Sequence, residues 1–200
     1  MRIRGLEIRV FDGVYPPSED TFLLMDAVSG ERAARGLELC SGTGAVGLSI
    51  ASRVVEMVAV DLNPAAAMNT LLNYRENGMR VHAVIGDLFS PLRGEFDLIL
   101  INPPYLPDGD GDPADLAWSG GASGRLIIDR FISEVGDFLS PGGRAYMLQS
   151  SLNGINESIE RAESEGLDAH VVGRRDFEFE SIVVMKMTWK AKGPKRAWKS

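Results

Sequence analysis

The stretch Glu38-Leu39-Cys40-Ser41-Gly42-Thr43-Gly44 carries the chain from an apolar strand, through a turn with two glycines, into a helix. Glycine lets a backbone turn sharply and approach a ligand closely, and this strand–turn–helix order is typical of the first unit of a Rossmann-like sheet. Gly47 completes a loose G-x-G-x-x-G spacing, which on its own is weak evidence for a dinucleotide site. The elements on either side of this stretch therefore have to decide the fold.

Strands and helices alternate along most of the chain, which predicts a parallel sheet with helices on both faces. Helices are expected over residues 19–28, 44–53, 64–77, 125–139 and 152–165, and strands over 37–40, 57–60, 81–85, 97–101, 145–148, 169–172 and 181–188. Pro141-Gly142-Gly143 is expected to turn the chain into strand 145–148. The last two strands have no helix between them, so they should be antiparallel. We predict one α/β domain over residues 1–189, Rossmann-like, with a seven-stranded and mostly parallel sheet that ends in an antiparallel hairpin.

The net charge of −7 is unevenly distributed along the 200 residues. Residues 190–200 form a basic tail that is expected to be disordered, and they leave a charge of −12 on residues 1–189. The five cations of this tail are Lys190, Lys192, Lys195, Arg196 and Lys199. A body this acidic is a poor general binder of duplex nucleic acid. The tail could still contact RNA or an acidic partner, although such a tail is more often a solvated end.

The composition also limits the compartment and the kind of site. A single cysteine, Cys40, excludes an internal disulfide and a multi-cysteine zinc site, and its strand context favours a core or pocket residue over a nucleophile. No group of histidine, cysteine and acidic residues has metal-ligand spacing, so we expect no metal. No signal peptide and no membrane-spanning run are recognisable, so we expect a cytoplasmic protein.

Acidic residues stand at the ends of three successive strands, where ligands of open α/β sheets collect. Glu38 precedes the glycine turn and suits a cationic or amino-bearing ligand better than a phosphate, which disfavours NAD and favours S-adenosylmethionine. Asp61 ends the second strand and can accept both hydroxyls of a ribose. Gly86-Asp87-Leu88 ends the third strand, where it could contact an adenine edge and ring. Each acidic residue alone could equally be a helix N-cap or a solvated loop end, but all three together indicate a nucleoside site.

Asn102-Pro103-Pro104-Tyr105 follows the buried run Phe96-Asp97-Leu98-Ile99-Leu100-Ile101, so it also lies at a strand end. Asn102 offers a side-chain carbonyl and Pro103 a backbone carbonyl, while neither proline has an N–H. The loop is therefore stiff, rich in acceptors and poor in donors, and Tyr105 adds a flat face for a planar group. Such a site can hold both N–H bonds of an amide or exocyclic amine. The simpler alternative is a proline-rich turn after a core strand.

These motifs resemble those of class I S-adenosylmethionine-dependent methyltransferases. They are most similar to the HemK-like glutamine methyltransferases of peptide-chain release factors, in the archaeal and eukaryotic branch. The resemblance covers residues 10–188. It is carried by residues 14–24, 38–44, 61–64, 86–88 and 102–105, including Val14-Tyr15-Pro16-Pro17-Ser18-Glu19-Asp20-Thr21. The family often has glycine where Cys40 stands.

The resemblance implies a site for S-adenosylmethionine and a site for the substrate. The implied cofactor-binding residues are Thr21, Glu38, Cys40, Gly42, Asp61, Asp87, Leu88 and Asn102. The implied substrate-binding residues are Asn102, Pro103, Pro104 and Tyr105, of which Asn102, Pro103 and Tyr105 are catalytic. In the eukaryotic branch a small zinc-binding activator protein covers a sheet edge.

The expected activity is N5-methylation of the glutamine in a Gly-Gly-Gln motif of a release factor. The same acceptor pair would serve a nucleobase amine, such as adenine N6 or ribosomal guanine N2. In that case Arg125, Arg130 and the basic tail could hold the nucleic-acid strand around the base. A binding module without turnover is a third possibility, which the intact motif argues against. Residues 107–124 carry four aspartates and are expected to form one wall of the substrate entrance that attracts a basic protein loop. They could equally be a solvated loop without a role.

Overall fold

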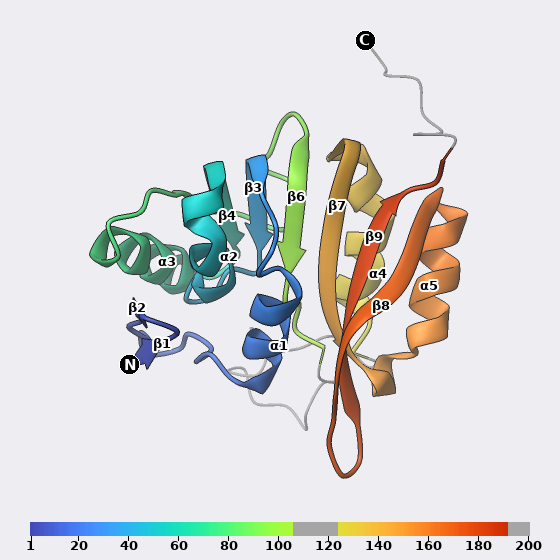
Figure 1. Ribbon diagram of the computed structural model, residues 1–200, viewed down its shortest axis with the longest axis horizontal. Coiled ribbons are helices and arrows are strands. Elements are labelled where there is room, and N and C mark those ends of the chain that lie inside the picture. Colours follow the sequence, from blue (N-terminus) through green and yellow to red (C-terminus); the bar gives the residue numbers. More distant parts are fainter. Residues whose placement is uncertain (106–123, 192–200) are drawn as a thin grey trace.

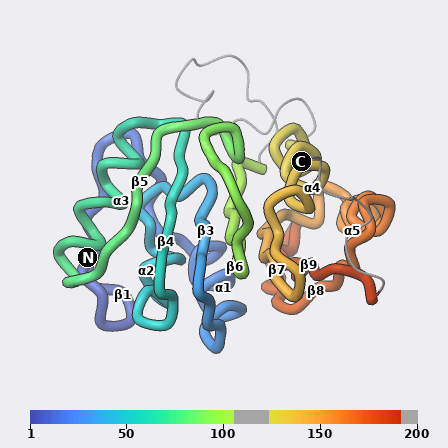
Figure 2. Tube along the Cα trace, turned by 90° about the horizontal axis from the view of Figure 1, so that it is seen from above, coloured from blue at the N-terminus to red at the C-terminus, as the bar shows by residue number. Residues whose placement is uncertain are grey.

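The computed structural model describes residues 1–105 and 124–191. Its middle layer is a seven-stranded sheet in the order β5-β4-β3-β6-β7-β9-β8 (Figures 1 and 2). The strands are β3 (Ala33–Leu39), β4 (Val54–Asp61), β5 (His82–Ile85), β6 (Phe96–Ile101), β7 (Leu139–Ser150), β8 (Leu167–Asp176) and β9 (Ser181–Trp189). Neighbours from β5 to β7 pair in parallel, whereas β9 is antiparallel to both β7 and β8. The predicted fold class is confirmed, including the antiparallel C-terminal hairpin.

Helices cover both faces of this sheet. They are α1 (Glu19–Ala27), α2 (Ala45–Ile50), α3 (Pro64–Glu76), α4 (Leu126–Glu134) and α5 (Ile155–Ser164). The central strand β6 shows why both faces are needed, because Leu98 and Leu100 pack on the side of α1, α2 and α3 while Ile99 and Ile101 pack on the side of α4 and α5. All four side chains are fully buried. A parallel strand covered on both faces has a continuous apolar sequence, as residues 98–101 do.

Three asparagines spaced four residues apart, Asn69 and Asn73 of α3 and Asn77 at its C-cap, hold the N-terminal segment through their side-chain amides. Each side-chain oxygen accepts a backbone N–H at 2.8–3.0 Å, in the pairs Asn77 with Glu7, Asn73 with Arg9, and Asn69 with Phe11. Helical residues four apart share one face, so this row of amides pairs with an extended backbone much as a neighbouring strand would. The segment that follows is thereby directed to the carboxyl edge of the sheet. The sequence did not predict the small antiparallel pair β1 (Arg2–Ile3) and β2 (Leu6–Glu7), which is too short to show alternation.

Two predictions between β6 and β8 were wrong in their boundaries. The helix expected over 125–139 ends at Glu134, and after a 3-10 turn over Val135–Asp137 the chain enters β7 at Leu139. The turn at 141–143 lies inside β7, because β7 pairs with β6 both before and after it, through Leu139 and again from Arg144. Between these two pairs β7 has three more residues than β6, and Gly142 has a φ of +78°, so the turn signal appears as an irregularity within the strand.

The helix expected over 152–165 was also wrong at its start. Residues Ser151–Asn153 form a separate 3-10 turn, and α5 begins at Ile155. Gly154 separates the two with a φ of +75°, in the left-handed region that glycine adopts without strain. The turn leaves the side chain of Asn153 buried, where it contacts the ends of other loops.

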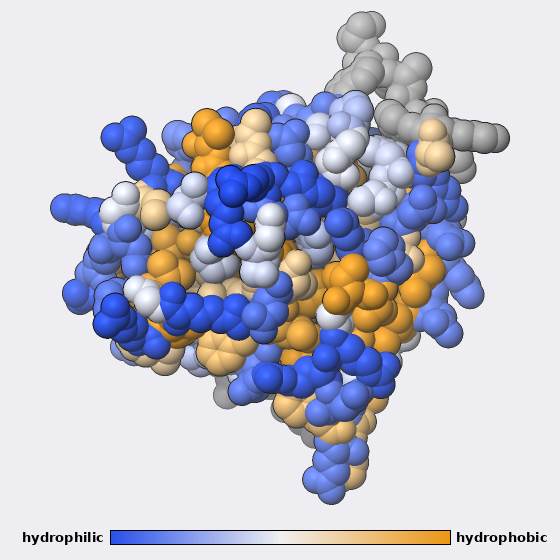
Figure 3. All heavy atoms as spheres, in the orientation of Figure 1, coloured by the Kyte–Doolittle hydropathy of each residue, from blue (hydrophilic) through white to orange (hydrophobic). Residues whose placement is uncertain are grey.

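The β8–β9 hairpin protrudes beyond the carboxyl edge of the parallel strands (Figure 1). Its tip carries two exposed aromatic side chains, Phe177 and Phe179. In the same view of the molecule, apolar atoms gather on the surface above the hairpin (Figure 3). Val171 and Val172 of β8 contribute exposed apolar side chains as well. The hairpin therefore stands beside the edge at which ligands of such a sheet bind.

The acidic loop expected over 107–124 lies almost wholly outside the described residues, as do residues 192–200 of the basic tail. The boundary drawn at residue 189 accordingly stays a prediction, although β9 does end there. Within the described helices, none is both long and apolar enough to cross a membrane. Over residues 1–105 and 124–191, no group of three or more histidine, cysteine and acidic side chains could hold a metal ion.

Candidate functional site

A cavity of about 700 Å³ lies at the carboxyl ends of β3, β4 and β6. It brings together every residue that the sequence singled out for a site, namely Thr21, Glu38, Cys40, Gly42, Asp61, Asp87, Leu88, Asn102, Pro103, Pro104 and Tyr105. The N-terminal segment adds residues to which the sequence analysis gave no separate role, among them Gly13, Tyr15 and Asp20. The stretch 14–24, which carries part of the family resemblance, already pointed to this segment. Nothing in the sequence showed which of its side chains contact Asn102.

Glu38 is the most strongly perturbed carboxyl of the cavity. It is 4% exposed, and its Oε2 has no hydrogen-bond partner among the described residues. Burial raises its pKa to about 8, with a smaller contribution from the charge of Asp61, while the backbone N–H groups of Gly47 and Val46 oppose the shift. Those two N–H groups belong to the first turn of α2, so Glu38 also caps this helix, as the simpler alternative for an acidic residue at a strand end predicted. A buried carboxyl of this kind is stabilised as an anion when a cation binds beside it.

The glycine turn is shaped by close packing around Glu38. A Cβ on Gly47 would lie 2.5 Å from Glu38 Oε2 and 2.6 Å from the hydroxyl of Tyr74, so no larger residue fits there. Gly44 has a φ of +73° and would place a Cβ 2.7 Å from Thr70. The third glycine of the loose G-x-G-x-x-G spacing thus makes room for a buried carboxyl rather than for a phosphate.

Asp61 is held by the turn that it faces. Its Oδ2 accepts the backbone N–H of Gly42 at 2.8 Å, and its Oδ1 accepts that of Asn63 at 2.8 Å. Burial raises its pKa, against the effect of these two hydrogen bonds. Each carboxylate oxygen has a second lone pair, so both oxygens can still accept a hydroxyl from a ligand in the cavity. The hydrogen bond also shows that the N–H of Gly42 serves to orient Asp61.

Asp87 and Cys40 also line the cavity. Asp87 forms a bidentate ion pair with Arg130, with N–O distances of 3.1 and 3.0 Å. A ligand could therefore bind only to the remaining lone pairs of the Asp87 carboxylate. Cys40 has a φ of +52°, which explains why glycine is common at this position in the family that the sequence resembles. Burial and the charges of Asp61 and Asp87 raise the pKa of the Cys40 thiol. A thiol kept protonated in this way is a pocket residue and a poor nucleophile.

The part of the cavity lined by Asn102 and Tyr105 is organised by Asp20. Asn102 Nδ2 donates to Asp20 Oδ2 at 3.0 Å, and the Tyr105 hydroxyl donates to the same oxygen at 3.3 Å. Burial, followed by the charge of Asp20, raises the pKa of Tyr105, so its hydroxyl keeps its proton at neutral pH. The other amide atom, Asn102 Oδ1, is buried and has no hydrogen-bond partner in the described part of the chain.

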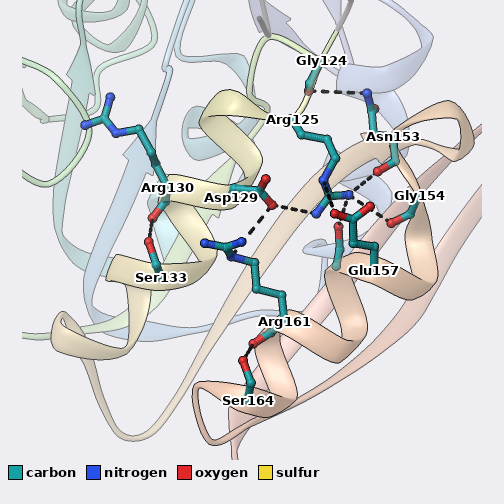
Figure 4. A network of polar contacts seen from close by, with 11 residues as sticks. Gly124, Arg125, Asp129, Arg130, Ser133, Asn153, Gly154, Glu157, Arg161 and Ser164 are labelled. Atoms are coloured by element: carbon teal, nitrogen blue, oxygen red, sulfur yellow. Dashed lines mark hydrogen bonds and ion pairs between the residues drawn. The ribbon is translucent and has the colours of Figure 1, made fainter. Parts of the chain in front are cut away.

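A second polar network fixes the backbone that follows Tyr105. Asn153 Nδ2 donates to the carbonyl of Tyr105 at 2.9 Å and to that of Gly124 at 3.4 Å, which joins two points of the chain on either side of residues 106–123. Arg125, at the start of α4, in turn donates to the carbonyls of Asn153 and Gly154 (Figure 4). The network therefore ties the end of the Asn-Pro-Pro-Tyr stretch to α4 and α5.

The two arginines that could have gripped a nucleic acid are engaged inside the protein. Arg125 is 7% exposed and forms ion pairs with Asp129 at 2.7 Å and Glu157 at 3.3 Å (Figure 4). Arg130 is paired with Asp87 and lies 3.7 Å from Glu134. The expectation that these arginines were available to a phosphate backbone was therefore wrong for Arg125. For Arg130 it would require breaking the pair with Asp87.

Comparison with known proteins gives consistent similarities. A family model described as methyltransferase small domain matches residues 17–165. A protein of Methanocaldococcus jannaschii named putative protein N5-glutamine methyltransferase is 34% identical over 190 residues, covering 92% of this chain and 96% of that protein. The human protein named methyltransferase HEMK2 is 36% identical over 194 residues, covering 89% of this chain and 91% of that protein.

A solved structure shows the same fold at 30% identity. It is a chain of the E. cuniculi Mtq2–Trm112 complex, described as responsible for methylation of the eRF1 translation termination factor. The TM-score is 0.72, and the match covers 89% of this chain and 99% of that chain.

We predict that Gly124→Ala destabilises the protein more than Gly142→Ala does. Both glycines have positive φ, +68° and +78°, but a Cβ on Gly142 meets nothing within 4 Å, whereas one on Gly124 would overlap the Tyr105 carbonyl and lie 2.5 Å from Asn153 Nδ2. The backbone strain alone should cost about 1–2 kcal/mol in each variant. The overlap should add about 1–3 kcal/mol at Gly124 only. Urea denaturation measures both, and equal losses would show that the contact with Tyr105 imposes no constraint.

Proposed function

The chain belongs to the methyltransferase small domain family, and from that premise we propose that it transfers a methyl group from S-adenosylmethionine to the glutamine of a Gly-Gly-Gln loop in a peptide-chain release factor. The acceptor atom would be the side-chain amide nitrogen, N5. The observation that carries this proposal is the pair of Asn102 amide atoms, one bonded to Asp20 and the other without a donor among the described residues. The names of the similar proteins support the choice of glutamine.

The substrate half of the cavity suits a primary amide. Asn102 Oδ1 and the carbonyl of Pro103 would each accept one N–H of the substrate amide, and neither Pro103 nor Pro104 can donate. An amide nitrogen is a weak nucleophile because its lone pair is delocalised into the carbonyl. Accepting both N–H bonds turns the nitrogen toward the methyl donor, and the ring of Tyr105 offers a face for the planar group.

The cofactor half of the cavity suits S-adenosylmethionine. Glu38 would stabilise its α-ammonium, Asp61 would accept the ribose hydroxyls, and Asp87 with Leu88 would contact the adenine. Glu38 Oε2 is buried and has no hydrogen-bond partner in the part of the chain that the structure describes, which supports a cation in this place. When bound, the cofactor supplies an electrophilic methyl group on a sulfonium.

The protein would then act mainly by positioning. The amide nitrogen forms the new N–C bond while the C–S bond breaks, and the cationic nitrogen afterwards loses one proton to solvent. Alignment of the two reactants removes most of the entropic barrier to their meeting. No strong base is required before the transfer. The wall of the cavity that would face the substrate, which we call the substrate wall, is built from Asp20, Asn102, Pro103, Pro104 and Tyr105 and agrees with this requirement.

The experiment that tests the proposal uses the full chain and methyl-labelled S-adenosylmethionine, with either a release factor or total RNA as acceptor. Label is expected in the release factor, on the glutamine of the Gly-Gly-Gln loop by mass spectrometry. A release factor with that glutamine replaced by alanine is the control and should stay unlabelled. Label in RNA alone would overturn the proposal in favour of a nucleobase amine.

We predict that Asn102→Ala abolishes most of the methyl transfer while S-adenosylmethionine affinity changes less than threefold. Losing one aligned hydrogen bond to a reacting group costs about 2.7–4 kcal/mol, by analogy with oxyanion-hole donors, or a rate loss on the order of 100- to 1000-fold. Asn156→Ala, at an exposed position of α5, is the matched control. Single-turnover rates and calorimetry separate the two effects, and a near-normal rate for Asn102→Ala would contradict its assignment.

We predict that Asp61→Ala weakens S-adenosylmethionine binding at least tenfold. A charge-assisted contact to two ribose hydroxyls is worth about 1.5–3 kcal/mol. Asp168→Ala removes an exposed carboxylate of β8 and serves as the control in the same calorimetric titration. Unchanged affinity after Asp61→Ala would mean that the ribose binds elsewhere.

We predict that the affinity for S-adenosylmethionine rises between pH 6 and pH 8. The pKa of Glu38 in the free protein is raised to about 8, so below pH 8 the group is mostly protonated and must release a proton when the α-ammonium binds beside it. The measurements stop at pH 8 because the α-amino group itself loses its proton at about 7.7–8.0. Glu38→Gln should bind more weakly and should lack this rise. A rise of the same size in Glu38→Gln would assign the titration to another group.

The edge strand β5 supports the proposal of a small activator partner, since the E. cuniculi relative is described in complex with Trm112. β5 is an edge of the seven-stranded sheet, and Ile85 on it is 56% exposed. The neighbouring helix α3 adds exposed Met68 and Leu71. An open edge with apolar side chains is a surface that another chain can cover. Mixing the chain with a Trm112-type protein should give a 1:1 complex in size-exclusion chromatography, and Ile85→Asp should abolish it.

A further inference from the structure

Asp20 is buried, lines the cavity, and contacts the Asn102 and Tyr105 side chains of the substrate wall. We propose that Asp20 locks the Asn102 carboxamide as a hydrogen-bond acceptor toward the substrate, and that it thereby makes the site select an NH₂ group and reject a carboxylate. Asp20 would act through Asn102, as a positioning and specificity-determining residue. The inference rests on the proposed function for its substrate, but the orientation of Asn102 can be tested without any substrate.

The lock follows from the chemistry of the two side chains. A carboxamide can turn by 180° about its last bond and so exchange its oxygen with its NH₂ group. The carboxylate of Asp20 can only accept, and its Oδ2 lies 3.0 Å from Asn102 Nδ2. The flipped amide would place Asn102 Oδ1 against that oxygen, so a charge-assisted hydrogen bond would be lost. Water could not replace it easily, because Asp20 is only 4% exposed. Only one orientation of the amide is therefore stable.

Asp20 is itself held in place by local contacts of α1. Its Oδ1 accepts the backbone N–H of Thr21 at 2.6 Å and the Thr21 hydroxyl at 3.2 Å. It lies in the first turn of α1, where the helix dipole favours a negative side chain. With Oδ1 fixed on the helix, Oδ2 is directed at the substrate wall, where it accepts from Asn102 and Tyr105. The orientation of the Asn102 side chain is thus defined by a residue 82 positions away in sequence.

The lock leaves the other end of the amide available to a substrate. Because the oxygen and the nitrogen of a carboxamide point in different directions, Oδ1 is turned away from Asp20, and it has no donor among the described residues. A buried acceptor without a donor is costly, so a substrate N–H gains the full hydrogen bond. Bonding to a carboxylate also polarises the amide and makes Oδ1 a stronger acceptor. As the substrate nitrogen becomes cationic this hydrogen bond strengthens, so its effect falls on kcat.

Selectivity follows from the same geometry. With Asn102 locked, the substrate wall presents acceptors, namely Asn102 Oδ1 and the carbonyl of Pro103, and a glutamate in place of the substrate glutamine would oppose acceptors with acceptors. A site built to receive N–H groups rejects an analogue without them by a large factor. If residue 20 could also donate, the Asn102 amide could turn and offer its NH₂ group to a carboxylate.

The test compares Asp20→Asn with Asp26→Asn, using the full chain and a release factor. Asp26 lies on the same helix, but its side chain is 64% exposed and pairs with Arg4 at 2.7 Å, away from the cavity lining. For Asp20→Asn we expect kcat to fall at least tenfold, with S-adenosylmethionine affinity within threefold of the wild type and an unchanged melting temperature. Asp26→Asn should match the wild type. A kcat for Asp20→Asn within threefold of the wild type would overturn the proposal, and so would an equal loss of kcat and cofactor affinity.

Two further measurements distinguish a lock from general damage. A Gly-Gly-Glu peptide should inhibit Asp20→Asn at least fivefold more strongly than it inhibits the wild type. In the double variant Asp20→Asn/Asn102→Asp, the new amide at position 20 donates to the new carboxylate at position 102. The second carboxylate oxygen at position 102 still faces the substrate as an acceptor. The kcat of the double variant should therefore exceed that of Asp20→Asn at least fivefold. Absence of both effects would mean that Asp20 acts only through packing.

The orientation of Asn102 can be observed directly by NMR with ¹⁵N-asparagine labelling, in the absence of substrate. One Nδ2 hydrogen of Asn102 should exchange slowly and be shifted downfield in the wild type, and both features should be lost in Asp20→Asn. Their absence in the wild type would overturn the lock even if a release factor is methylated. Their presence, together with no methylation of a release factor by the wild type, would leave the lock standing and reject the proposed substrate.

Discussion

The burial of β6 on both faces is the constraint on which the rest of the structure depends. Its alternating side chains join two separate apolar clusters, one with α1, α2 and α3 and one with α4 and α5. A strand packed in this way cannot shift by one residue without moving each side chain to the opposite face. The position of Asn102, directly after the strand, is therefore set by the packing of the whole domain. The glycine turn after the neighbouring β3 is placed at the same edge by the parallel pairing of the two strands.

Polar contacts then bring the N-terminal segment over this edge. Asn69, Asn73 and the C-cap residue Asn77 of α3 pair with the backbone of residues 7–11, and Asn63 donates to the carbonyl of Gly13 at 3.0 Å. These amides replace the backbone partner that an extended segment otherwise lacks. The result is a cavity lined on one side by strand ends and completed on the other by the first turn of α1. This division suits the proposed methyl transfer, because the two reactants would be held by different parts of the chain.

The sequence predicted the fold and the composition of the cavity more fully than it predicted boundaries and partners. The order of elements and the antiparallel end of the sheet follow from hydrophobic patterns within single segments, and these were confirmed. The extent of β7 and the start of α5 were wrong, because pairing with β6 and the left-handed Gly154 outweigh the local signals. Arg125 was weighed as a grip for nucleic acid in the alternative reading, and it is instead buried against Asp129 and Glu157. Charge alone does not tell a buried ion pair from an exposed cation.

The sequence by itself determined the order of strands and helices, the strand ends at which Glu38, Asp61, Asp87 and Asn102 stand, and the family to which the chain belongs. These properties depend on spacing and on side-chain type, which are local. Only the tertiary structure decided which way Asn102 faces, since its partner Asp20 lies 82 residues earlier, on a helix near the N-terminus. It also decided that Asn153 would hold the carbonyl of Tyr105. Such contacts join side chains that are distant in sequence, and they exist only once the two apolar clusters have packed the elements together.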